Sequence, residues 1–304
     1  MVKIENITKT YEKGKVKALT NINLSIEKGE LFGLIGPDGA GKTSLFRILT
    51  SLLIPDSGIV KIMNFDVVKD YKEIRKITGY MPGKFSLYQD LSVEENLNFF
   101  ASVFGTTVKE NYSLIEDIYV QIEPFKKRLA GKLSGGMKQK LALSCALIHK
   151  PEILVLDEPT TGVDAVSRKE FWEMLKKLKS EGITILVSTP YMDEASLCDR
   201  IALIQNGEIL SVDKPLNIIN QFNKKLFAIR TSNMYQLMQD LKQFGGLNTA
   251  FLFGQVVHFT SKNENTNSEE IRFFLKENNH SDIFIKEIVP SIEDCFMEFA
   301  KNEK

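Results

Sequence analysis

The chain has 304 residues, of which 43% are hydrophobic and 26% charged, an ordinary composition for a soluble globular protein with one large domain or a medium and a small one. Lysine plus arginine and aspartate plus glutamate both number 39, so the net charge is zero. This balance argues against a general electrostatic affinity for nucleic acid or anionic lipid, although it does not exclude a local patch.

Targeting, membrane and disulfide signals are absent from the sequence. Residues 1–6 lack the apolar segment of a signal peptide, and no run approaches the ~18 apolar residues needed to cross a bilayer. We therefore expect any action on a membrane to require partners. The cysteines show no paired spacing, which predicts buried or half-buried free thiols in a reducing compartment. They are Cys145, Cys198 and Cys295.

The first part of the chain, to about Asn220, alternates short apolar runs with helical patterns, as is typical of parallel strands joined by crossover helices. More regular alternation in Val16–Ile26 and Ile59–Val67 predicts antiparallel strands beside the main sheet. We therefore predict an α/β fold with a parallel core and an antiparallel subdomain. The expected parallel strands are Leu31–Ile35, Ile153–Asp157, Ile183–Ser188 and Ile201–Ile204.

The strongest motif, GPDGAGKT, follows the first parallel strand and precedes a helical pattern. Glycines let backbone amides approach phosphate oxygens, and the helix N-terminus adds donors and a favourable dipole. This order favours a P-loop that binds ATP over a chance glycine turn. Lys42 would neutralise the β- and γ-phosphates as an exposed charge, and Thr43 would ligate Mg²⁺. The expected binding residues are Gly36, Pro37, Asp38, Gly39, Ala40, Gly41, Lys42, Thr43 and Ser44.

A helical insertion is predicted at about residues 85–150. Ser92 and Ser113 each stand three residues before a glutamate, the spacing of a capping box at a helix start. Farther along, LSGGM opens another helix, with Ser134 as a good N-cap and Gly135 and Gly136 baring the amides behind it.

This second anion-binding helix end cannot easily serve the same nucleotide as the P-loop. We therefore expect it to bind a nucleotide held by another subunit. The alternative interpretation, a capped structural helix, accounts for Ser134 but not for both glycines.

Two acids end the strand Ile153–Asp157, at the edge of the sheet where the P-loop is also expected. Asp157 would hold Mg²⁺ through its water shell, and Glu158 would polarise the attacking water as general base. The alternative, a pair of acids that only caps the strand, fits poorly beside a P-loop.

After Asn220 the pattern changes to a small α+β unit in the order β-α-β-β-α-β, which predicts a ferredoxin-like appendage closed by a helix at Ile292–Lys301. We therefore divide the chain into a nucleotide-binding domain at residues 1–220 and an accessory domain at residues 221–304.

The P-loop, LSGGM and LDEPTTGVD, in this order, resemble the nucleotide-binding domain of ABC ATPases over about residues 2–220. The resemblance implies a head-to-tail dimer that holds two ATP molecules, each between residues 36–44 of one subunit and Ser134–Gly136 of the other. It further implies that Tyr11 stacks on adenine and that Asp164 couples the two sites.

Two positions depart from the family pattern. Gly83 stands where the family has a glutamine that ligates Mg²⁺, and Gln89 lies too far along the chain to replace it. Pro190 stands where the family has a histidine that contacts the γ-phosphate. Loss of one preorganised donor typically lowers the rate ~10²–10³-fold. The departures predict either a weakened site or hydrolysis that relies mainly on Glu158.

The resemblance implies an ATP-driven motor subunit of a transporter. Residues 190–195 and the appendage resemble the branch that exports drugs and polysaccharides. The implied partners are a separate integral-membrane permease, docked at Phe85–Phe104, and a second ATPase subunit, identical or not, with no nucleic acid. The implied location is cytoplasmic, at the inner face of the cell membrane.

Two alternatives remain at this point. One is a regulatory pseudo-ATPase, which binds ATP without turnover. The other is a soluble ABC ATPase that acts on DNA or ribosomes; such proteins usually carry two ATPase domains or a long coiled coil, and this sequence shows neither.

Overall fold

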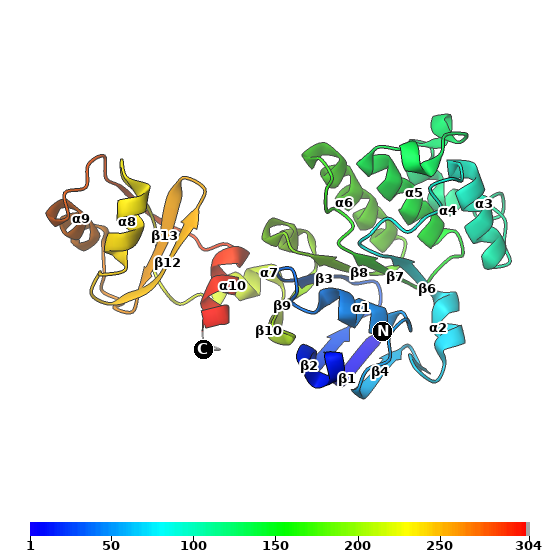
Figure 1. Ribbon diagram of the computed structural model, residues 1–304, viewed down its shortest axis with the longest axis horizontal. Coiled ribbons are helices and arrows are strands. Elements are labelled where there is room, and N and C mark those ends of the chain that lie inside the picture. Colours follow the sequence, from blue (N-terminus) through cyan, green and yellow to red (C-terminus); the bar gives the residue numbers. More distant parts are fainter. Residues whose placement is uncertain (302–304) are drawn as a thin grey trace. The chain divides into compact units, whose positions relative to one another are not determined.

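The computed structural model describes residues 1–301 and divides the chain into two compact units, one at Met1–Pro215 and one from Leu216 onward (Figure 1). The division falls at the start of helix α7 (Pro215–Asn220), whereas the sequence places it at the end of that segment. Among the described residues, no helix combines the length and apolar character needed to cross a membrane.

The first unit is built on a six-stranded sheet in the order β10-β9-β3-β8-β7-β6. All neighbours are parallel except β10, which runs antiparallel to β9. Strands β3, β7 and β8 are buried along their whole length, as their continuous apolar sequences predict. In spatial order the strands are β10 (Glu208–Asp213), β9 (Arg200–Gln205), β3 (Leu31–Ile35), β8 (Thr184–Thr189), β7 (Ile153–Asp157) and β6 (Thr78–Met81).

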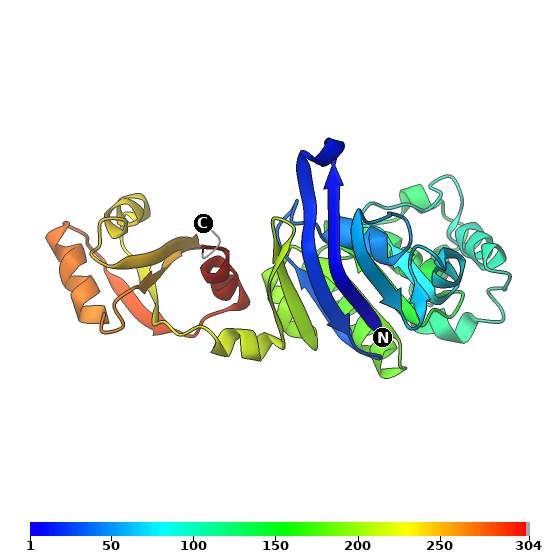
Figure 2. The ribbon, with the colours of Figure 1, turned by 90° about the horizontal axis from the view of Figure 1, so that it is seen from below.

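An antiparallel sheet in the order β2-β1-β4-β5 lies beside this core, and Figure 2 shows β1 and β2 as a long pair. Its inward side chains share one hydrophobic core with helix α1 (Lys42–Leu49) and with β3. The run Ile59–Val67, expected as one strand, forms two, because the chain turns at Met63, which has φ 57°. The strands of this sheet are β2 (Val16–Ile26), β1 (Val2–Tyr11), β4 (Ser57–Ile62) and β5 (Phe65–Asp66).

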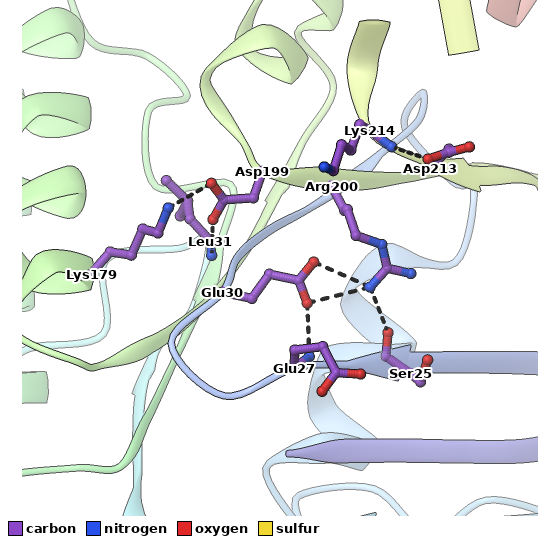
Figure 3. Close-up of polar contacts among 9 residues, drawn as sticks. All are labelled: Ser25, Glu27, Glu30, Leu31, Lys179, Asp199, Arg200, Asp213 and Lys214. Carbon is purple, nitrogen blue, oxygen red and sulfur yellow. Dashed lines mark hydrogen bonds and ion pairs between the residues drawn. The ribbon is translucent and has the colours of Figure 1, made fainter. Parts of the chain in front are cut away.

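A polar network fixes the N-terminal end of β3 (Figure 3). The Arg200 guanidinium donates to the Glu30 carboxylate at 3.2 and 3.4 Å and to the Ser25 carbonyl at 3.4 Å. Asp199 accepts from the Leu31 backbone N–H at 2.9 Å and from Lys179 on α6 (Ala165–Ser180) at 2.5 Å. The network therefore ties both sheets and α6 to the strand that leads into the P-loop.

The helical insertion contains α3 (Val93–Val103), α4 (Tyr112–Tyr119) and α5 (Gly135–Leu147), and α5 packs against α3, α4 and β6. The capping box at Ser92 is confirmed: its Oγ accepts from Glu95 N at 3.2 Å, and its N–H donates to the Glu95 carboxylate at 2.7 Å. Helix α2 spans Tyr71–Ile77, and 3-10 turns lie at Glu12–Gly14, Glu123–Phe125, Ala130–Lys132 and Met192–Leu197.

The second predicted capping box, at Ser113, is wrong. Helix α4 begins at Tyr112, so Ser113 lies inside it. Asn111 precedes the helix without a side-chain capping bond, and its side-chain NH2 donates to the Ile148 carbonyl at 2.7 Å and to the Thr106 hydroxyl at 2.9 Å. The Asn111 side chain is thus held by tertiary contacts and does not cap α4.

The second unit has the predicted ferredoxin-like order, with an antiparallel sheet β12-β13-β11-β14. Helices α8 and α9 pack on one face around Phe227, Phe259 and Leu237. Helix α10 meets the other face, where Asp294 lies 2.7 Å from the His258 imidazole. In chain order the elements of this unit are β11 (Leu226–Arg230), α8 (Met234–Leu241), β12 (Leu247–Phe253), β13 (Val256–Ser261), α9 (Ser268–Glu277), β14 (Phe284–Ile288) and α10 (Ile292–Lys301).

The two serines give a matched test of this account. Ser92→Ala should lower the free energy of unfolding by about 1 kcal/mol, because the Glu95 backbone N–H loses its cap. Ser113→Ala, at an exposed helical position, should change it by less than about 0.5 kcal/mol. Urea unfolding followed by the fluorescence of Trp172, the single tryptophan, reports on the first unit. Equal losses in both variants would contradict the assigned helix starts.

Candidate active site

The P-loop turns from the C-terminal end of β3 into α1. Gly39 and Gly41 have φ of 80° and 105°, in the region that favours glycine. A Cβ atom at Gly41 would lie 2.3 Å from the Ala18 carbonyl oxygen, so a side chain is excluded there. The turn itself therefore favours glycine at positions 39 and 41, and it brings the N-terminus of α1 to the carboxyl edge of the parallel sheet.

Lys42 is the first residue of α1, and its ammonium is fully used within the site. It donates to the carbonyl oxygens of Gly36 at 2.8 Å and Pro37 at 3.0 Å, and it lies 3.1 Å from a carboxylate oxygen of Glu158. The side chain is only 3% exposed, so the prediction of an exposed charge is wrong. The loop curls around the ammonium, and its three donors are satisfied by two carbonyls and one acid.

The acidic pair follows β7 as predicted. Asp157 is 2% exposed and accepts a hydrogen bond from the Ser188 hydroxyl at 2.6 Å. Glu158 has φ 50°, an uncommon conformation for a residue with a side chain. Its backbone N–H donates to the Ser188 carbonyl at 3.1 Å and to the Ser188 hydroxyl at 3.0 Å. Sequence analysis missed Ser188, whose only signal is a polar residue at the end of an apolar strand.

The donor set available to a cation consists of oxygen atoms. Thr43 offers a hydroxyl in the first turn of α1, and Asp157 offers its Oδ2, which has no protein hydrogen bond among residues 1–301. Across the same residues, no group of three or more His, Cys, Asp and Glu side chains could hold a metal unaided. A site that offers only a few hard oxygen ligands suits Mg²⁺. In nucleotide sites this ion keeps several water ligands and also binds phosphate oxygens.

Tyr11, at the end of β1, reaches the P-loop helix from the antiparallel subdomain. Its hydroxyl lies 3.1 Å from the Ser44 Oγ, and 37% of the side chain remains exposed. The Lys9 ammonium lies 5.9 Å from the ring centroid. The structure thus places an accessible aromatic ring beside the P-loop, and stacking on adenine stays a prediction.

The LSGGM segment begins α5 as predicted, and the Ser134 Oγ accepts from Met137 N at 3.4 Å. A Cβ atom at Gly136 would lie 2.8 Å from the Ser167 Oγ, so packing against α6 explains that glycine. At Gly135 the nearest atom would be the Gly162 carbonyl oxygen at 3.5 Å, and a side chain would fit. The structural interpretation therefore accounts for Ser134 and Gly136 and leaves Gly135 unexplained. Across residues 1–301, no hydrogen bond or ion pair joins Ser134–Gly136 to the P-loop.

Asp164 is the N-cap of α6, where its carboxylate accepts from Ser167 N at 3.0 Å and Val166 N at 3.1 Å. The backbone N–H and then the hydroxyl of Ser167 hold the pKa of this exposed carboxyl below its usual range. Asp164 therefore has a local structural role, and coupling across a dimer stays a prediction.

Gly83 and Pro190 are the two positions at which the sequence predicts a departure from the family pattern, and Gly83 lies beside the acidic pair. A Cβ atom at Gly83 would lie 3.1 Å from the Asp157 carbonyl oxygen and 3.7 Å from the Glu158 Cβ. Pro190 directly follows β8, and its side chain has no donor. Gln89 lies elsewhere, with its carbonyl oxygen 3.0 Å from the Gly131 N–H.

A second missed set of residues fixes the segment after Pro190. The buried Glu194 carboxylate accepts from the Thr160 hydroxyl at 3.1 Å and lies 3.6 Å from the Arg168 guanidinium. Arg168 also pairs with Asp193 at 2.9 Å and lies 5.0 Å from the Tyr191 ring centroid. This cluster joins α6 and the residues after the acidic pair to the segment after β8.

An apolar cavity of about 450 Å³ lies between the helical insertion and the core, lined by parts of α3, α5, β6 and the ends of α1 and α2. The His149 ring stacks on Phe104 at a centroid distance of 3.8 Å, and burial lowers the pKa of this imidazole. Among the described residues, Thr78 Oγ1 and His149 Nδ1 are buried without a hydrogen-bond partner. The cavity is thus a mainly apolar surface with a few unused polar atoms.

Comparisons with known proteins identify the family. The family model described as ABC transporter matches residues 19–161. The Nod factor export ATP-binding protein I of Rhizobium sp. (strain N33) is 30% identical over 294 residues, which cover 95% of this chain and 94% of that protein. The chain belongs to the ATP-binding subunits of ABC transporters.

Another ABC relative is the probable multidrug ABC transporter ATP-binding protein YbhF of Escherichia coli (strain K12), 38% identical over 307 residues. The match covers 98% of this chain and 52% of YbhF, so the chain spans about half the length of that relative. The dimeric ATP-binding cassette MJ0796, solved with ADP and Pi after hydrolysis, superposes with a TM-score of 0.64 at 31% identity, covering 70% of this chain and 98% of that one. The fold is thus the ABC type of P-loop NTPase.

The Lys42 contacts predict a specific effect of its removal. Lys42→Ala should weaken ATP binding about 10- to 100-fold or more, because hydrogen bonds to charged groups typically contribute about 1.5–3 kcal/mol. Titration with a fluorescent ATP analogue measures this affinity, and circular dichroism checks that the variant is folded. Lys140→Ala is a matched control, since the half-buried Lys140 also forms an ion pair with a glutamate, Glu170, but away from the P-loop. Wild-type affinity in folded Lys42→Ala would remove the P-loop assignment.

Proposed function

We propose that this chain is the ATP-binding and ATP-hydrolysing motor subunit of an ABC exporter. The observation that carries the proposal is the meeting of Lys42 and Glu158, whose charged atoms lie 3.1 Å apart at the carboxyl edge of the sheet. A cation from the P-loop and a carboxylate that follows a buried strand thus lie next to each other. Together they provide groups for binding phosphate and for orienting a water molecule.

In the proposed reaction each residue has a separate task. The backbone amides of the P-loop and the N-terminus of α1 bind the β- and γ-phosphates, and the Lys42 ammonium moves from Pro37 and Glu158 to phosphate oxygens. Thr43 and Asp157 hold Mg²⁺, which when bound neutralises phosphate charge. Glu158, released from Lys42, accepts a proton from the water that attacks the γ-phosphate.

We further propose two kinds of partner. Ser134–Gly136 lie at a helix end without polar contact to the P-loop of the same chain, which supports a sandwich with a second ATPase subunit. The apolar cavity beside Phe104 and His149 supports docking of a helix from an integral-membrane permease, at the cytoplasmic face of the membrane. The name of the Rhizobium relative supports export, and zero net charge gives no support for a nucleic-acid partner.

The sandwich predicts that blocking hydrolysis traps a dimer. Glu158→Gln should bind Mg-ATP and accumulate as a dimer, because the amide cannot accept the proton from water. Size-exclusion chromatography with and without ATP, alone and with the cognate permease, measures the association. As a control, Glu170→Gln removes a carboxylate of α6 that pairs with Lys140 on α5, away from the P-loop, and should leave association unchanged. Glu158→Gln that remains monomeric under every condition would argue against the sandwich.

A second candidate is the weaker half of an unequal ATPase pair. Gly83 lies beside the acidic pair but lacks the side-chain amide of a glutamine, and the side chain of Pro190 has no hydrogen-bond donor. Both departures concern the site built on this chain's own P-loop, whereas Ser134, Gly135 and Gly136 are retained for the opposite site. The retained Asp157 and Glu158 argue the other way, since a silent site needs no general base.

The two arrangements differ in which variant stops turnover of the whole transporter. In an unequal pair, Ser134→Arg in this chain should lower ATP turnover more than Glu158→Gln, because Ser134 would serve the active opposite site. The measurement is ATPase activity of the transporter purified from its native cell, with its ATPase subunits identified by mass spectrometry. Equal losses, or a complex that holds only this ATPase, would rule the unequal pair out in favour of a slowly hydrolysing homodimer.

A further inference from the structure

The Ser188 hydroxyl occupies a central place in the site that none of the sequence motifs assigns. It lies at the carboxyl end of β8, fully buried, with β3 on one side and β7 on the other. A serine hydroxyl has one proton to donate and two lone pairs. Here the proton goes to Asp157 Oδ1 at 2.6 Å, and one lone pair accepts from Glu158 N at 3.0 Å. One side chain therefore contacts both members of the acidic pair.

On the Asp157 side, the bond fixes the direction of the carboxylate. An O–H···O⁻ contact of this length is a strong, charge-assisted hydrogen bond. It commits Oδ1 to the protein and leaves Oδ2 without a protein hydrogen bond among residues 1–301. The oxygen available to the water shell of Mg²⁺ is thereby selected by Ser188.

On the Glu158 side, the bond supports an unfavourable backbone conformation. A residue with φ near 50° persists only where its surroundings hold it. The Glu158 N–H is held by the carbonyl and the hydroxyl of the same residue, Ser188, at 3.1 and 3.0 Å. This conformation aims the carboxylate at Lys42, where the general base is proposed to act.

We infer that Ser188 is a positioning residue for ATP hydrolysis, which orients Asp157 toward the Mg²⁺ water shell and Glu158 toward the attacking water. The inference rests on the proposed ATPase function. Gly83 and Pro190 supply no side-chain hydrogen bond near the acidic pair, so the hydroxyl beneath it carries more of the orientation. Groups that orient metal ligands in this way typically change metal affinity or activity 10–100-fold when removed.

Thr184 on the same strand provides a matched control. Its hydroxyl is also fully buried and accepts from Gly29 N at 3.0 Å, but it lies at the opposite end of β8 from the acidic pair. A hydroxyl that only stabilises the sheet should behave alike at both positions. A positioning hydroxyl should affect metal binding and turnover at Ser188 alone.

The test uses the full chain with Ser188→Ala, Ser188→Thr and Thr184→Val. Electron paramagnetic resonance titration of Mn²⁺ with a non-hydrolysable ATP analogue gives the metal affinity, and steady-state assays give kcat and KM. We expect Ser188→Ala to lower Mn²⁺ affinity about 10-fold and kcat about 10- to 100-fold, with KM nearly unchanged. Ser188→Thr should restore most of both, and Thr184→Val should lower only the melting temperature.

Several outcomes would overturn the inference. Wild-type Mn²⁺ affinity and kcat in Ser188→Ala would do so, as would equal losses in Thr184→Val. If Ser188→Ala does not fold, Ser188→Cys fills the buried position with a slightly larger and weaker donor and should fall between wild type and the expected alanine values; no change would count against the role. A wild-type chain that binds Mn²⁺ and the ATP analogue but does not turn over ATP would instead refute the proposed hydrolysis, and the Mn²⁺ titration would still decide the role of Ser188.

Discussion

The carboxyl end of β8 is the place on which the rest of the site depends. β8 lies between β3 and β7 in the sheet, so the P-loop leaves on one side of it and the acidic pair on the other. The Thr189 carbonyl accepts from Gly36 N at 3.3 Å, and Ser188 contacts both acids. Parallel pairing thus brings together two motifs that are far apart in the sequence, and the Lys42–Glu158 contact closes the arrangement.

The other end of the sheet explains why this place is rigid. At the start of β3, Arg200 pairs with Glu30, and Asp199 accepts from the Leu31 backbone N–H. Arg200 is the first residue of β9 and Asp199 directly precedes that strand, so β9 fixes the start of β3. The strands between these polar ends are fully buried, and a close-packed core resists displacement. A site built on such strands holds its geometry better than one built on loops. The carboxylates of the acidic pair are held in turn by Ser188 and Lys42.

Local patterns in the sequence were sufficient for the elements and motifs but not for the contacts between them. Leu31–Ile35 and Ile153–Asp157 were predicted to the residue, because continuous apolar runs end at motifs with one structural meaning. Ser92 and Ser113 have the same local pattern, yet only Ser92 caps a helix, because α4 begins at Tyr112 and Ser113 lies inside it. The burial of Lys42 and the role of Ser188 depend on neighbouring strands, which no local pattern records.

The segment that contains Gly83 lies next to two cavities. Residues 81–82 and Ser86 line the apolar cavity and also a smaller one that contains Gly83 and Glu158. One segment therefore borders both the proposed permease site and the site of hydrolysis. At position 83 the segment has no side chain to offer the acids, and a Cβ atom there would already lie 3.1 Å from the Asp157 carbonyl oxygen, a tight contact. The direction of the acids, in contrast, is set by hydrogen bonds with Ser188. Under the proposed docking, a permease helix in the apolar cavity would therefore contact a segment next to two acids whose orientation depends on a different strand, β8.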